Sequence, residues 1–141
     1  MKFDEFSIGD TFTTNDYKVT DKDIHEFASE FDPQYIHIDK EKAEQGRFKG
    51  IIASGIHTLS LSFKLWVETK KYGEDIIAGT QMNNIKFIKP VFPNDSLHVV
   101  IKVIDKHSIK PDSGLLTVRL STFNQDDDIV FKGELTALIA K

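Results

Sequence analysis

The chain has 141 residues, 40% of them hydrophobic and 28% charged, with a formal net charge of −4 and no cysteine. This composition predicts one globular domain over 1–141. It excludes a disulfide framework and a thiol nucleophile, and it lacks the basic excess of nucleic-acid-binding proteins. The first residues, MKFDEFSIGD, contain no apolar run typical of a signal peptide or membrane span, so we expect a cytoplasmic protein that does not bind membranes.

The first predicted helix covers residues 21–31, DKDIHEFASEF, where apolar side chains recur at helical spacing behind Thr20, an N-cap residue type. It should end at Asp32, because the following Pro33 disfavours helical geometry in the residue before it. Beyond the turn, the alternation of residues 36–38 (IHI) predicts an extended segment.

Two more helices are expected before the sheet. A short helix in KEKAEQ, residues 40–45, would begin after Asp39 and end at Gly46 in the left-handed conformation. A long helix would run from an N-cap at Ser54 to an end at Gly73. Its apolar residues lie on more than one side, which indicates a mostly buried central helix.

The rest of the chain has the texture of β-structure. Strands are predicted within 78–90, 96–109, 115–124 and 129–140, separated by turn-forming residues, and an early strand is predicted within 11–19. Short turns favour an antiparallel meander. An antiparallel sheet wrapped around one long helix is an α+β architecture, the hot-dog fold.

Asp32 and His37 are the first candidate functional pair. If residues 36–38 are extended, His37 points away from both isoleucines, and its ring could converge with the Asp32 carboxylate on one small space. A carboxylate and an imidazole that share a water can deprotonate it and return the proton elsewhere. The alternative, a turn aspartate and an ordinary strand histidine, stays open at this point.

Ser54 and Gly55 are the second candidate, because a helix N-terminus offers free amides to a carbonyl oxygen and glycine permits close approach. The alternative is an ordinary helix cap. His57 lies either near the mouth of this site or in solvent. The five histidines are scattered without metal-ligand spacing, so no metal site is expected.

The stretch FDPQYIHIDKEKAEQGRFKGIIASGIHTLSL, together with the later IKFIKPVFPNDSLHV, resembles the MaoC-like dehydratases, which include the R-specific enoyl-CoA hydratases. Their usual motif is Asp, any residue, Asn, Pro, an aliphatic residue, then His. Asp32 and His37 keep this spacing, whereas Gln34 and Tyr35 stand in place of Asn and Pro. Tyr35 removes a proline that would stiffen the loop.

The resemblance implies a lyase of fatty acid metabolism. Asp32 and His37 would activate a water that adds to C3 of a trans-2-enoyl thioester, or in reverse dehydrate a 3-hydroxyacyl thioester. The Gly55 amide, beside Ser54, would polarise the thioester carbonyl. Three residues are weaker candidates for substrate contacts: Ile56, His57 and Leu59.

The resemblance also implies no cofactor beyond the carrier of the acyl group, either coenzyme A or an acyl carrier protein, and a homodimer with a continuous sheet. Candidates for phosphate contacts are Arg47, Lys49, Lys86 and Lys89. Two alternatives remain: a catalytically silent module that binds acyl thioesters or a partner, and an acyl-CoA thioesterase. The thioesterase ranks lower, because the first half of the central helix has no carboxylate; Glu68 comes only near its end.

Overall fold

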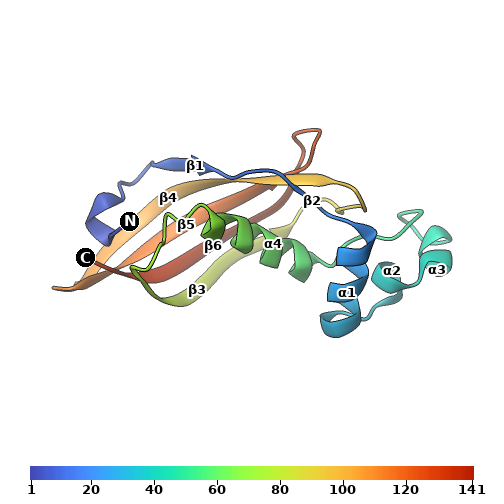
Figure 1. Ribbon diagram of the computed structural model, residues 1–141, viewed down its shortest axis with the longest axis horizontal. Coiled ribbons are helices and arrows are strands. Elements are labelled where there is room, and N and C mark those ends of the chain that lie inside the picture. Colours follow the sequence, from blue (N-terminus) through green and yellow to red (C-terminus); the bar gives the residue numbers. More distant parts are fainter.

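A computed structural model describes residues 1–141 as a curved antiparallel sheet that embraces one long helix, α4 (Gly55–Glu68) (Figure 1). Three short helices gather beyond the N-terminal end of α4. They are α1 (Asp21–Phe31), α2 (Tyr35–Ile38) and α3 (Lys40–Glu44). The strands are β1 (Thr11–Thr13), β2 (Tyr17–Lys18), β3 (Ile76–Phe87), β4 (Ser96–Lys110), β5 (Ser113–Phe123) and β6 (Ile129–Ala140), and a 3-10 turn spans Phe3–Glu5. The predicted hot-dog fold is confirmed.

The strand order is β1-β4-β5-β6-β3, with β2 paired to β4. The predicted meander holds for β4, β5 and β6 but is wrong for β3, which pairs with β6. The reason is that β1 and β2 already occupy the free edge of β4. The outer edge of β3 therefore remains unpaired.

No helix is both long enough and apolar enough to span a membrane.

The core lies between α4 and the concave face of the sheet. Leu61, Leu65 and Trp66 of α4 are buried, Trp66 completely. Along β4, β5 and β6 buried and partly exposed residues alternate, as expected of strands with one face on a core. Each fully buried large aliphatic or aromatic side chain contributes about 1.5–3 kcal/mol to folding. The sheet thereby holds α4 as a rigid axis for the site at its N-terminus.

The predicted helix starts are confirmed. Thr20 caps α1 in a capping box, in which its hydroxyl accepts from the Asp23 amide and the Asp23 carboxylate accepts from the Thr20 amide. Asp39 caps α3 by accepting from the Lys42 amide. Ser54 stands at the N-cap of α4, but its side chain makes no capping bond. That hydroxyl donates to the Asp32 carboxylate instead.

The predicted helix ends are wrong in two places. The central helix ends at Glu68 rather than Gly73, because Lys70 already adopts a left-handed conformation with φ 63° and turns the chain. Gly46 is not left-handed. Its amide instead closes α3 with a three-residue turn by donating to the Ala43 carbonyl at 3.0 Å.

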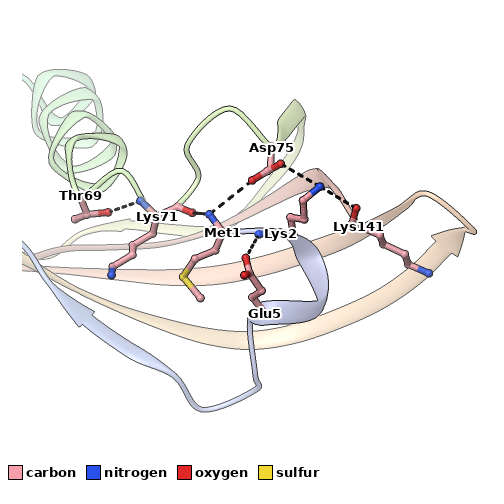
Figure 2. A network of polar contacts seen from close by, with 7 residues as sticks. All are labelled: Met1, Lys2, Glu5, Thr69, Lys71, Asp75 and Lys141. Atoms are coloured by element: carbon pink, nitrogen blue, oxygen red, sulfur yellow. Dashed lines mark hydrogen bonds and ion pairs between the residues drawn. The ribbon is translucent and has the colours of Figure 1, made fainter.

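The two chain ends meet near the C-terminal end of α4 (Figure 2). The Met1 amino group donates to the Lys71 carbonyl at 2.6 Å and lies 3.9 Å from the Asp75 carboxylate. Lys2 Nζ lies 3.8 Å from Asp75 and donates to the Lys141 carbonyl at 3.3 Å. These contacts fasten both termini to the loop between α4 and β3, at the opposite end of α4 from the short helices.

Candidate functional site

A cavity of about 520 Å³ lies at the N-terminal end of α4, where the short helices meet the sheet. Its polar lining comes from the α1–α2 loop and from the residues just before α4. The polar residues of these two segments are Asp32, Gln34, His37 and Ser54, and Thr58 and Lys89 add to the polar lining. Apolar walls complete it, including Phe48, Ile52, Ile56, Phe87, Ile88 and Val91. A mostly apolar cavity with a few convergent polar groups is typical of a small-molecule site.

The segment that carries His37 is a helical turn, so the predicted extended conformation is wrong. The His37 amide donates to the Gln34 carbonyl at 3.0 Å, and the Asp39 amide donates to the Tyr35 carbonyl at 2.9 Å. A turn satisfies these amides locally in a segment that does not pair with the sheet. The predicted convergence nevertheless occurs, because the turn brings His37 back over the end of α1, where Asp32 is the C-cap residue.

The Asp32 and His37 side chains meet in a defined geometry. His37 Nε2 lies 3.2 Å from Asp32 Oδ2, with the two side chains 4% and 16% exposed. His37 Nδ1 lies 2.6 Å from the Ile52 carbonyl oxygen. Because a carbonyl oxygen only accepts, Nδ1 carries a hydrogen, so Nε2 is the nitrogen that can accept a proton in the neutral ring. The backbone thus fixes a tautomer suited to a general base.

Two hydrogen bonds hold the Asp32 carboxylate. Ser54 Oγ donates to Oδ2 at 2.7 Å, and Gln34 Nε2 donates to Oδ1 at 2.7 Å. The Ser54 bond, followed by the Gln34 bond, lowers the pKa of Asp32 below its ordinary value, against the opposing effect of burial; His37 adds to the lowering. The carboxylate therefore stays ionised. Ser54 was predicted as a helix cap or, with Gly55, as part of a site for the thioester carbonyl. Its bond to Asp32 and that of Gln34 were not predicted.

Gly55 presents its backbone to the same cavity. The first amide of this helix that donates back to the turn is that of Thr58, to the Ser54 carbonyl at 3.1 Å, so the Gly55 amide has no acceptor. A Cβ at Gly55 would lie 2.8 Å from Phe87 Cδ1, so any other residue at this position would have to displace the ring or the start of α4. Phe87 is part of the cavity wall and was not predicted from the sequence.

Of the three weaker candidates for substrate contacts, only one lines the cavity. Ile56 lines the cavity and is 52% exposed. Neither His57 nor Leu59 belongs to the lining. His57 is buried and stacks on Phe27 with ring centroids 4.6 Å apart, and this burial lowers the pKa of His57. Leu59 packs, partly buried, against the hydrophobic core.

The four basic residues predicted to contact phosphate differ in whether they line the cavity. Lys89 lines the cavity, where its ammonium lies 3.3 Å from the Asp128 carboxylate. Arg47, Lys49 and Lys86 lie outside the lining. One of the four is therefore placed at the candidate site.

Comparisons with known proteins agree with this fold. The family described as MaoC like domain matches residues 5–124, and the chain belongs to that family. Protein YdeM of Bacillus subtilis (strain 168) is 57% identical over 141 residues, covering 100% of both chains.

Two solved structures are similar over the whole chain. A MaoC-like dehydratase from Rhodospirillum rubrum superposes with a TM-score of 0.92 at 29% identity, covering 100% of this chain and 97% of the other. A monoamine oxidase regulatory protein from Archaeoglobus fulgius gives a TM-score of 0.93 at 28% identity, covering 100% and 95%.

Proposed function

We propose that this protein is an R-specific hydratase of trans-2-enoyl thioesters, which in the reverse direction dehydrates 3-hydroxyacyl thioesters. The observation that carries the proposal is the Asp32–His37 pair at the polar end of an apolar cavity, beside a free amide of α4. Membership of the MaoC-like family and the similarity to a protein described as a dehydratase support it. Fatty-acid metabolism in the cytoplasm is the proposed setting.

The proposed step begins with a water held between Asp32 and His37. Neutral His37 accepts one proton at Nε2, the Asp32 carboxylate accepts a hydrogen bond from the same water, and the oxygen adds to C3 of the substrate. The imidazolium then returns its proton to C2. One O–H bond is broken, one C3–O and one C2–H bond are formed, and no further reactant is consumed.

The Gly55 amide supplies the electrostatic part of the proposal. As the oxygen adds to C3, negative charge develops on the thioester carbonyl oxygen, and an unpaired amide at the positive end of α4 can donate to it. One such preorganised donor stabilises a transition state by about 3–4 kcal/mol in other enzymes. The acyl tail would lie against the apolar walls, with coenzyme A or an acyl carrier protein as its carrier.

The proposal includes a homodimer formed through β3. The outer edge of β3 is unpaired, and Ile77, Met82 and Phe87 on this strand are exposed. On α4, Ile56, Phe63 and Val67 are also exposed, and Phe63 lines one hollow together with Met82. Pairing β3 with its copy would satisfy the edge amides and cover these side chains. Light scattering after gel filtration would test this, and Met82→Lys should shift the protein toward monomer.

Hydration of crotonyl-CoA and longer trans-2-enoyl-CoAs tests the reaction, followed as loss of the conjugated thioester absorbance. Asp32→Asn and His37→Ala should each lower kcat/KM by about 10²–10⁴ without loss of folding. The matched controls are Asp105→Asn and His107→Ala, which alter an exposed Asp–His pair far from the cavity lining and should keep full activity. Unchanged turnover in Asp32→Asn would overturn the proposal, and chiral analysis of the product checks the R configuration.

The two alternatives predict different results in the same assay. A silent acyl-binding module, suggested by Gln34 and Tyr35 in the motif, would bind acyl-CoA without turnover at any chain length. A thioesterase would release free thiol, abolished in Glu68→Gln. Glu68 is the last residue of α4 and is not part of the cavity lining, which argues against the thioesterase.

A further inference from the structure

The convex face of the sheet, opposite α4, carries a cluster of cations outside the candidate site. One comes from each long strand: Lys86 of β3, Lys102 of β4, Arg119 of β5 and Lys132 of β6. Their neighbours on these strands, including Ile101, Leu120 and Phe131, are buried in the core. Because side chains alternate along a strand, the four cations point outward. In a chain of net charge −4, this gathering of positive charge stands out.

The strand register places these cations directly opposite one another. Lys86 pairs with Lys132 between β3 and β6, and Lys102 pairs with Arg119 between β4 and β5. Like charges directly opposite in an antiparallel pair destabilise the sheet. On its other side Arg119 lies opposite Glu134 of β6, which offsets part of the repulsion. None of the four cationic side chains makes a hydrogen bond or ion pair, although Arg119 and Lys132 are only partly exposed. The Lys86–Lys132 pair has no such carboxylate opposite it, so this part of the face keeps an excess of positive charge.

Three of the cations share one hollow of about 300 Å³ with Asn84 and Glu134. The Asn84 side-chain amide donates to Glu134 Oε1 at 3.2 Å, which engages the single carboxylate of the hollow. Asn84 lies in an irregularity of β3 and has a left-handed φ of 52°, so a break in the strand directs this side chain into the hollow. Two ammonium groups and a guanidinium thus face one carboxylate, an excess of positive charge that suits a dianion.

We propose that this hollow binds a phosphate group. Arg119 can bind two phosphate oxygens at once, while Lys86 and Lys132 act as point charges on either side. The hollow lies across the sheet from the cavity at the same end of β3, since Lys86 directly precedes the cavity residue Phe87. Phosphate of the coenzyme A arm and phosphate of a free metabolite share this chemistry, and they can be told apart by experiment.

Thermal unfolding in inorganic phosphate, compared with chloride at equal ionic strength, tests the site itself. Phosphate should raise the Tm of the wild type and of the control Lys110→Met, an exposed lysine on the same sheet outside the hollow, but not that of Lys132→Met. Without phosphate, Lys132→Met should melt above the wild type, because the repulsion from Lys86 is gone. Equal phosphate stabilisation of Lys132→Met and wild type, or none in the wild type, would overturn the proposal.

Calorimetric titration separates the two sources once phosphate binding is seen. If the coenzyme A arm is the ligand, Lys132→Met and Arg119→Met should weaken coenzyme A binding about tenfold, and dephospho-coenzyme A should bind wild type and variants alike. If a free metabolite is the ligand, the variants should lose inorganic phosphate but bind coenzyme A as the wild type does. Both results support the site, and neither depends on hydratase activity.

Discussion

Two Asp–His pairs in this molecule have similar geometry and different surroundings. In Asp105–His107, on β4, Nε2 lies 2.9 Å from Oδ2, and the side chains are 50% and 68% exposed. In Asp32–His37 the same atoms lie 3.2 Å apart, with 16% and 4% exposed. The closer pair is in solvent, where an ion pair contributes about 0–1 kcal/mol. Proximity alone therefore does not distinguish a candidate active site.

The surroundings distinguish the two pairs. Asp32 accepts from Ser54 and Gln34, which are themselves part of the cavity lining, whereas Asp105 accepts only from its neighbour, the Lys106 amide, besides its contact with His107. The Ile52 carbonyl fixes the hydrogen of a neutral His37 ring on Nδ1, whereas the Asp105 carboxylate fixes that of His107 on Nε2. A buried, oriented pair at a cavity can move a proton toward a bound substrate.

The largest expected loss of activity comes from changes to the buried pair, and a double variant tests whether Asp32 and His37 act together. If Asp32 and His37 hold one water, the double variant Asp32→Asn/His37→Ala should be no slower than the worse single variant, with kcat/KM down by about 10²–10⁴. The cycle on Asp105→Asn/His107→Ala should show no loss at any corner. If the double variant instead lost activity by the product of the two single-variant factors, Asp32 and His37 would act independently.

Gly55→Ala should have the next largest effect. The new methyl group would lie within 3 Å of the Phe87 ring, so either the ring or the start of α4 must move. A displacement of about 1 Å can cost up to 10²-fold in rate, and we expect a loss of about tenfold or more in kcat/KM. Adding Phe87→Leu should recover part of the activity. Failure of this rescue would indicate that the methyl group blocks the oxyanion position directly.

Ser54→Ala should act through the protonation of Asp32. The Ser54 bond is the largest cause of the lowered Asp32 pKa, so its loss raises that pKa toward the ordinary value of an aspartate. A lowered folded-state pKa stabilises the protein above the unfolded-state pKa, and this contribution disappears as the pH falls through the folded-state value. The variant should therefore lose about 1–3 kcal/mol of unfolding free energy at pH 7 and less near pH 3.

Urea unfolding between pH 7 and pH 3, with a carboxyl-carbon NMR titration of Asp32, measures both quantities. Thr58→Val is a suitable control, because its buried hydroxyl bonds the Ser54 carbonyl rather than Asp32. A constant difference between Ser54→Ala and wild type at all pH values would show that only packing was lost. It would also remove the support that Ser54 gives to the ionised carboxylate.

Periodicity and residue type predicted those features that depend on local preference. The Thr20 cap, the stop at Asp32 and the buried central helix all follow from such preferences, as does strand β6 over residues 129–140. The position of β3 did not, because it depends on which strand takes the edge of β4. The helical turn at Tyr35–Ile38 was missed because two isoleucines favour extended backbone, while unpaired amides after Pro33 favour a turn.

Some residues of the candidate site could likewise be predicted from the sequence, whereas the contacts between distant segments could not. Asp32, His37 and Gly55 could be proposed from residue type, spacing and resemblance, and they line one cavity. Neither the ring of Phe87 over Gly55 nor the bond from Ser54 to Asp32 could be predicted, since each joins segments more than 20 residues apart. Such contacts follow from tertiary packing, which one sequence read locally does not encode.

Gln34→Met should have the smallest effect and makes the finest test of the comparison between the two pairs. Methionine keeps the volume of glutamine but removes the Nε2 donor, so Asp32 Oδ1 loses its partner while Oδ2 keeps Ser54. Because Gln34 is exposed, water can replace part of this bond, and we expect kcat/KM to fall about two- to fivefold, mostly in kcat. The control Gln45→Met changes an exposed glutamine outside the lining. An effect on KM alone would instead indicate that Gln34 contacts the substrate. Gln34→Asn, which resembles the usual family motif, keeps the amide donor on a shorter side chain and shows whether the length of the side chain matters.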